Sequence, residues 1–89
     1  MNVSFHGSVR EFTNGEKSYD YPDPADRLSV RDLIGMLGSR FGERFREFLL
    51  GNETCLILIN GRSLAMAGGL DAELKAGDKI DVLPFIEGG

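Results

Sequence analysis

Polar and apolar residues alternate near the start of the chain in the way that half-buried β-strands require. Every second residue of the segment 2–6 is apolar, and the segment 17–21 places two tyrosines in the same alternation. Between these segments stands the pair Asn14-Gly15, which is a strong signal for a tight turn. The pattern therefore predicts an N-terminal hairpin, with a wide bend or a short helical turn between its two strands.

Helical spacing replaces this alternation further along the chain. Ser29 precedes the helical run, and Asp32 follows three residues later, close to a capping-box pattern with Asp in place of the usual Glu. We expect Gly38 and Gly42 to end or interrupt the helix, and 43–51 to add one or two further helical turns. The apolar residues of the main run would share one helix face: Val30, Leu33, Ile34, Leu37 and Phe41.

The second half of the chain reads as strands joined by glycine-bounded connections. The run Thr54–Ile59 is a continuous stretch of β-branched and apolar residues, which predicts a fully buried central strand. A turn at Asn60-Gly61 leads into a short return arm at 62–66, and the connection 68–78 follows. Alternation resumes in 79–85, which predicts the last strand.

These elements together predict the fold class. Two strands, a helix, a central strand and a C-terminal strand within 89 residues indicate an α+β protein. A mixed sheet packed over one main helix in this order matches the β-grasp, or ubiquitin-like, architecture. We expect a β-grasp domain at 1–84 and a flexible tail at 85–89 that ends in Gly-Gly.

Composition and charge exclude several kinds of partner and site. The net charge of −4 argues against a nucleic-acid phosphate binder and gives no basic stripe for a membrane surface. The start of the chain lacks the apolar run of a signal peptide, and no apolar stretch approaches membrane-spanning length, so we expect a cytoplasmic protein. A single cysteine rules out an internal disulfide framework and a self-contained cysteine metal site. We predict no metal site, no nucleic-acid partner and no membrane partner.

Two side chains with reactive potential have simpler interpretations. Cys55 lies within an apolar strand run without an obvious activating partner, which favours a buried packing cysteine over a reactive thiol. His6 is the only histidine, and no Ser-His-Asp or metal-binding constellation can be assembled around it, which favours a structural role. We therefore expect no catalytic residue in this chain.

The chain ends on Gly88-Gly89, a pair that is a weak signal by itself and gains weight from its position just after the last predicted strand. Glycine has no Cβ, so such a tail can thread a narrow channel and present the terminal carboxylate to a partner. A carboxylate is a poor electrophile, so the partner would have to activate it, for instance as an acyl-adenylate. The alternative is a frayed terminus or a chain cut at a glycine. The position of the pair and the predicted fold together favour the functional tail.

The apolar residues just before the glycines allow two interpretations. Leu83, Phe85 and Ile86 either complete the core or lie beyond the last strand pairing on an exposed arm. We favour the exposed arm, for which a groove in a partner is the better explanation.

Several segments resemble the MoaD/ThiS family of ubiquitin-like sulfur carriers, and most closely the small subunit of molybdopterin synthase. The specific segments are "LILINGRSL", "GLDAELKAGDKIDVLP" and the terminal "EGG", and "FHGSVREFTNG" resembles the family's first strand and following turn. The family usually ends in an aromatic residue, two prolines, a small aliphatic pair and Gly-Gly. This chain has Leu83 at the aromatic position, keeps Pro84, and departs from the pattern at Phe85 and Glu87.

The resemblance implies a function for the tail. A ubiquitin-activating-like enzyme would use ATP to adenylate Gly89, which would then become a thiocarboxylate, and Gly88 would give access to it. The chain would be a covalent co-substrate that binds no cofactor itself and passes sulfur to an acceptor enzyme, for example the large subunit of molybdopterin synthase. The residues implied in partner docking are Leu83, Pro84, Phe85, Ile86 and Glu87.

The departures from the family's ending leave the acceptor pathway open. Molybdopterin-type cofactor synthesis is the first expectation, and thiamine synthesis or the synthesis of cysteine or other amino acids is a further one. The alternative is a ubiquitin-like modifier that is joined to protein lysines through Gly89.

Overall fold

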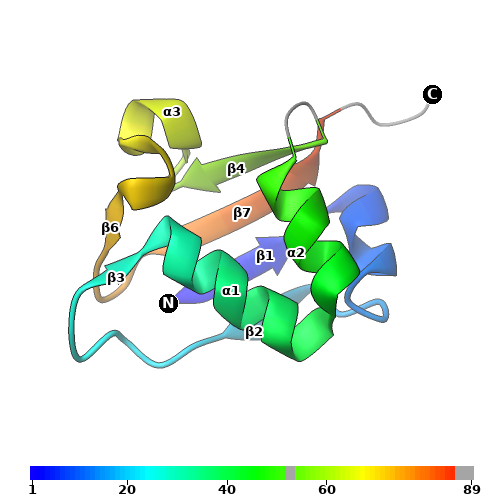
Figure 1. Cartoon of the computed structure of the whole chain (residues 1–89), viewed down its shortest axis with the longest axis horizontal. Coiled ribbons are helices and arrows are strands. Elements are labelled where there is room, and N and C mark those ends of the chain that lie inside the picture. Colours follow the sequence, from blue (N-terminus) through cyan, green and yellow to red (C-terminus); the bar gives the residue numbers. More distant parts are fainter. Residues whose placement is uncertain (52–53, 86–89) are drawn as a thin grey trace.

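The computed structural model describes residues 1–51 and 54–85. Its main sheet is mixed and has helices on one of its faces (Figure 1). The sheet has five strands in the order β2-β1-β7-β4-β5, which are Ser18–Asp20, Asn2–Phe5, Lys79–Pro84, Cys55–Ile59 and Arg62–Ser63. The α-helices are α1 (Val30–Phe41), α2 (Glu43–Leu50) and α3 (Leu64–Ala67), and the 3₁₀ helices are η1 (Gly7–Glu11) and η2 (Gly69–Asp71). A second sheet pairs β3 (Leu28–Ser29) with β6 (Glu73–Leu74).

The predicted N-terminal hairpin is confirmed. Strand β1 pairs with β2 in antiparallel fashion and with β7 in parallel fashion. The expected helical turn between the hairpin strands is η1, and Asn14 and Gly15 form the tight turn with φ values of 55° and 83°. Both strands are shorter than predicted, because β1 ends at Phe5 and β2 covers only Ser18–Asp20.

The predicted capping box starts α1. The backbone N–H of Asp32 donates to Ser29 Oγ at 3.1 Å, and the N–H of Ser29 donates to Asp32 Oδ2 at 3.0 Å. Gly42, at φ +118°, ends α1, and α2 begins at the next residue. The interruption at Gly42 is confirmed, but the following segment is a full helix that packs beside α1, so two helices cover the sheet (Figure 1).

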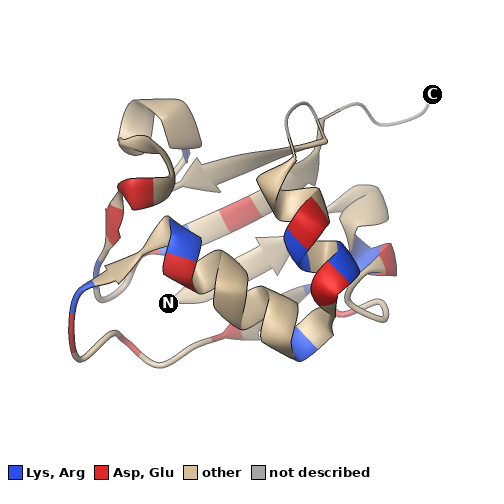
Figure 2. Cartoon of the chain, in the orientation of Figure 1, with Lys and Arg blue, Asp and Glu red and all other residues tan. Residues whose placement is uncertain are grey.

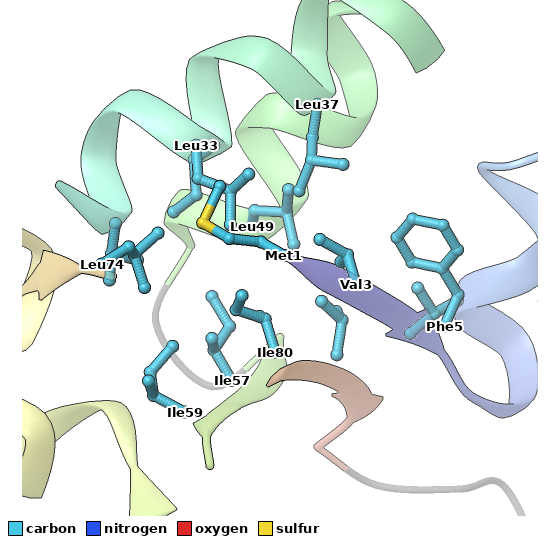
Figure 3. Close-up of a cluster of buried hydrophobic side chains, with 14 of the residues drawn as sticks. Met1, Val3, Phe5, Leu33, Leu37, Leu49, Ile57, Ile59, Leu74 and Ile80 are labelled. Carbon is cyan, nitrogen blue, oxygen red and sulfur yellow. The ribbon is translucent and has the colours of Figure 1, made fainter. Parts of the chain in front are cut away.

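The hydrophobic core lies between the helices and the inner face of the sheet. Figure 3 shows Leu33, Leu37 and Leu49 of the helices above Val3 and Ile80 of the central strands. These five side chains are at most 4% exposed. The apolar face of α1 and the inward-facing side chains of β1 and β7 therefore pack together in one hydrophobic layer.

The prediction that Thr54–Ile59 is a fully buried central strand is wrong. The central strand is β7, because it pairs with β1 on one side and with β4 on the other. Strand β4 pairs along its far side only with the two residues of β5. Its inner residues Ile57 and Ile59 are buried, but Leu56 on the outer face is 41% exposed. Helices cover only one face of the sheet, so an unbroken apolar run here places leucines on an open face (Figure 1).

Smaller differences concern the segments after β4. The predicted return arm at 62–66 is the short strand β5 followed by the helix α3. The connection 68–78 contains η2 and β6, and its pairing with β3 was not predicted because each of these strands has only two residues. Strand β7 ends at Pro84, so Phe85 lies just outside it. No helix in the described part of the chain is long and apolar enough to cross a membrane.

Candidate functional site

The end of β7 is the point from which the glycine tail departs. Leu83 and Pro84 are half-buried in the last strand positions, and Phe85 is 45% exposed directly after them. The remaining residues assigned to the site from the sequence are Ile86, Glu87, Gly88 and Gly89, and they lie outside the described residues. The described part of the site is therefore Leu83, Pro84 and Phe85, which we call the anchor of the tail.

Hydrogen bonds between β4 and β7 hold this anchor in place as far as its last residue, Phe85. In an antiparallel ladder, pairs that exchange hydrogen bonds alternate with pairs that do not. The N–H of Phe85 donates to the carbonyl of Thr54 at 3.4 Å, which places the pair Cys55–Pro84 in a non-bonded position. Proline has no N–H, but the β4–β7 ladder requires none at this position, so Pro84 costs no hydrogen bond to β4.

Apolar side chains surround the anchor on the outer face of the sheet. Leu83 stands opposite Leu56, and Leu58 is two residues further along β4 on the same side. We call Leu56, Leu58 and Leu83 the outer leucine face. Figure 2 shows that the β4 and α3 ribbons carry no charged residue. Sequence reasoning missed Leu56 and Leu58, although their alternation with Ile57 would have identified them once the inner face was known.

A histidine–aspartate pair borders the outer leucine face. His6 Nε2 lies 2.8 Å from Asp81 Oδ1, and the backbone N–H of His6 donates to the carbonyl of Val82 at 3.0 Å. Asp81 stands in register with Leu58, so the pair adjoins the outer leucine face. Within the described ranges no three His, Cys, Asp or Glu residues gather closely enough to hold a metal ion. The arrangement fixes the orientation of the imidazole ring and supplies a polar border to an apolar surface.

Cys55 is half-buried, not fully buried as predicted, and its surroundings do not activate it. Its Sγ lies 3.8 Å from the carbonyl oxygen of Phe48 at the end of α2. Burial raises the pKa of the Cys55 thiol. The thiolate is the nucleophilic form, so a raised pKa leaves this group less reactive than an ordinary cysteine near neutral pH.

The arrangement of these elements defines the class of protein. A hairpin leads into α1, the helix crosses the inner face of the sheet, and the first and last strands lie parallel at its centre. This is the β-grasp, ubiquitin-like fold, and its last strand ends at Pro84 near the exposed residues Leu56 and Phe85.

Comparison with known proteins identifies the family. The ThiS family model matches residues 3–89. A relative from Archaeoglobus fulgidus, described as a "Putative sulfur carrier protein", is 30% identical over 69 residues, which cover 73% of this chain and 78% of the relative. The chain therefore belongs to the ThiS family, and it is a MoaD/ThiS-like, ubiquitin-like sulfur-carrier protein.

Two solved structures agree with this assignment over nearly the whole chain. One is a chain of the Amycolatopsis orientalis BexX/CysO complex, with 30% identity and a TM-score of 0.75, covering 99% of this chain and 98% of that one. The other is described as "Putative molybdopterin converting factor, subunit 1" from Pyrococcus furiosus, with 30% identity, a TM-score of 0.70 and 93% coverage of both chains. The predicted fold and family are thereby confirmed.

Proposed function

We propose that this protein carries sulfur as a thiocarboxylate on its C-terminal residue, Gly89. The observation that carries the proposal is that the ThiS family model matches the chain through residue 89 and so includes the terminal Gly88-Gly89 pair. The protein is a covalent co-substrate in this scheme. It supplies the acyl group and the recognition surface, and its partners supply the catalytic side chains and the bound ATP.

The chemistry requires activation before sulfur can be added. The Gly89 carboxylate attacks the α-phosphate of ATP in a ubiquitin-activating-like enzyme, which forms an acyl-adenylate and releases pyrophosphate. A sulfur nucleophile at the oxidation level of sulfide then attacks the acyl carbon, and AMP leaves. The product is a terminal –COSH group, and no change in oxidation state occurs at the glycine.

The features of the described fold that support this role surround the end of β7. Strand pairing anchors the chain as far as the Phe85 N–H, four positions before Gly89 in the sequence. The outer leucine face and Phe85 offer an apolar surface at the end of β7, and such surfaces typically mark contacts with protein partners. A thiol nucleophile within the chain is not required, which agrees with the unactivated Cys55.

Within this proposal, the acceptor of first choice is a molybdopterin-synthase-type large subunit. The likeness to a molybdopterin converting factor subunit supports that choice, and delivery of sulfur to amino-acid synthesis is the second candidate. Both roles share the activation of Gly89 and differ only in the enzyme that takes the sulfur.

The proposal is tested by ATP–pyrophosphate exchange with the ubiquitin-activating-like enzyme encoded in the same genome. We expect the full chain to support exchange and a chain without Gly88 and Gly89 to support none. Gly88→Ala should lower kcat/KM by about tenfold or more, because a methyl group crowds a channel that fits glycine. Gly35→Ala, in α1 with open space where the new Cβ would lie, is the matched control and should react like wild type. Exchange that is undiminished in the truncated chain would overturn the proposal.

A further inference from the structure

We propose that the open edge of β4 at Cys55–Ile57 binds an extended, uncharged peptide segment of a partner protein as an additional strand. The edge borders a groove between the end of α2 and the start of α3, which we call the edge groove. Its principal lining residues are Leu49, Leu50, Cys55, Ile57, Leu64 and Leu70. This surface takes no part in the tail chemistry, so the inference does not rest on the proposed function.

The register of the sheet leaves backbone groups available at this edge. Asn60 donates to the Lys79 carbonyl and Phe85 donates to the Thr54 carbonyl, so the even-numbered residues of β4 direct their N–H and C=O groups toward β7. The odd-numbered residues direct theirs to the opposite side. Strand β5 meets that side only at Leu58 and Ile59. In the described ranges, no strand pairs with Cys55 or Ile57 there.

The groove beside this edge suits apolar side chains. It encloses about 270 Å³, which is below the usual size of a small-molecule site. None of the described residues that line it is charged, in a chain with 27% charged residues. An occupant that brought a charge into it would lose hydration without gaining an ion pair. The groove therefore fits one or two apolar side chains of a peptide better than a cofactor.

The small size of the site argues for a peptide strand as the occupant, and against a second copy of this chain. The open edge is three residues long, which is about 10 Å of strand. A stable dimer needs about 800 Å² from each partner, far more than this strip offers. A short extended segment can use the same strip, because backbone hydrogen bonds supply affinity and alternate side chains supply specificity.

The added strand would contact both faces of the sheet at once. One set of its alternate side chains enters the edge groove on the helical side. The other set lies on the opposite face of the sheet, beside the exposed Leu56 of the outer leucine face. Leu56 stands opposite Leu83 of β7. A partner that binds this edge can therefore also contact the apolar surface around the end of β7.

The test uses a short peptide probe and the whole wild-type chain. The probe is N-acetyl-Ser-Val-Ile-Val-Ser amide, and binding is followed by NMR chemical shifts and amide hydrogen exchange. We expect saturable binding with a Kd on the order of a millimolar. In the free protein the Ile57 amide should exchange faster than those of Leu56 and Leu58, and the peptide should slow it by about tenfold or more.

Two N-methylated versions of the probe separate strand addition from apolar contact. An added strand turns every second N–H toward β4 and the others toward solvent. Methylation of the isoleucine nitrogen removes the central N–H of one set, and methylation of both valine nitrogens removes the other set. We expect one version to bind like the parent and the other to bind about tenfold more weakly. Equal binding by both versions would overturn the proposal, as would the absence of saturable binding at several millimolar peptide.

A pair of variants on α3 locates the site. Ala65 is exposed and lines the groove, whereas Met66 on the same helix is 69% exposed and does not line it. Ala65→Glu should weaken binding about tenfold, and Met66→Glu should leave it unchanged. Equal effects of the two variants would contradict this location. Protection of the Ile57 amide that grows with protein concentration, without peptide, would show a second copy as the occupant and would also overturn the proposal.

Discussion

Asp32 shows how one residue can connect the start of a helix to the pH dependence of stability. Its carboxylate accepts a hydrogen bond from the Ser29 N–H, and this bond, with the Ser29 side chain, lowers the pKa of Asp32 below its ordinary value of 3.8. The hydrogen bond exists only in the folded chain. The folded state therefore holds the charged form more strongly than the unfolded state does.

The sign of the pH effect follows from this difference. Near pH 3.8 the unfolded chain binds more protons at Asp32 than the folded chain, so the free energy of unfolding rises with pH. The contribution is fully present above about pH 4 to 5, and it is lost as pH falls through the lowered pKa. We expect Asp32→Asn to flatten the pH dependence of stability between about pH 5 and pH 2 relative to wild type. Urea unfolding across this range measures it, and identical curves for the two proteins would contradict the account.

The segment around Gly42 carries the main lesson at the scale of elements. Gly42 has φ +118° and ψ 157°, a conformation that side chains rarely adopt, and it allows α2 to fold back beside α1. Gly35 lies within α1, and a Cβ added there would meet no other atom within 4 Å, so its absent side chain only costs helix propensity. Substitution by alanine should therefore have opposite effects on stability at Gly42 and at Gly35.

We expect Gly42→Ala to destabilise the fold by roughly 2 kcal/mol, because the alanine is held in a strained backbone conformation. We expect Gly35→Ala to stabilise it by about 0.5–1 kcal/mol, since alanine is the better helix former. Chemical denaturation of both variants and the wild type measures the two changes. A neutral Gly42→Ala would show that the connection between α1 and α2 tolerates an ordinary residue.

Local signals in the sequence predicted most of these elements correctly. The capping box at Ser29 and Asp32 and the Asn14-Gly15 turn act through neighbouring residues, so their consequences are visible in the sequence itself. The burial of β4 could not be read in the same way. Its run of apolar residues is compatible with two covered faces or with one, and only the placement of both helices on a single face decides between them. The two-residue pairing of β3 with β6 is likewise set by tertiary contacts.

At the scale of the whole molecule, the fold has one covered face and one open face. Helices α1 and α2 pack on the inner face, so the exposed side chains of Leu56 and Phe85 and the half-buried Leu58 and Leu83 lie where a partner can reach them. The sequence predicted Leu83, Pro84 and Phe85 as docking residues, and this remains a prediction. It did not predict Leu56 and Leu58, because the strand order that places them beside Leu83 depends on long-range pairing.

Phe85 and Met66 offer a matched test of docking at the end of β7. Both are exposed apolar residues, at 45% and 69% exposure, but only Phe85 adjoins the tail. We expect Phe85→Glu to raise the KM of the activating enzyme for this protein by about tenfold, because a charge replaces an apolar contact. Met66→Glu should leave the KM unchanged. Equal KM values for the two variants would place partner docking elsewhere on the molecule.

The central claim is that Gly89 carries the sulfur, and the most direct test is the intact mass of the protein isolated from its native host without reducing or acidic work-up. We predict a species about 16 Da heavier than the unmodified chain, the difference between sulfur and oxygen at the activated acyl group, with the change localised to Gly89 by fragmentation. A gain of about 32 Da on Cys55, the mass of a persulfide sulfur, with an unchanged Gly89 would contradict the account. Adducts that join Gly89 to protein lysines, without any thiocarboxylate, would instead identify a protein modifier.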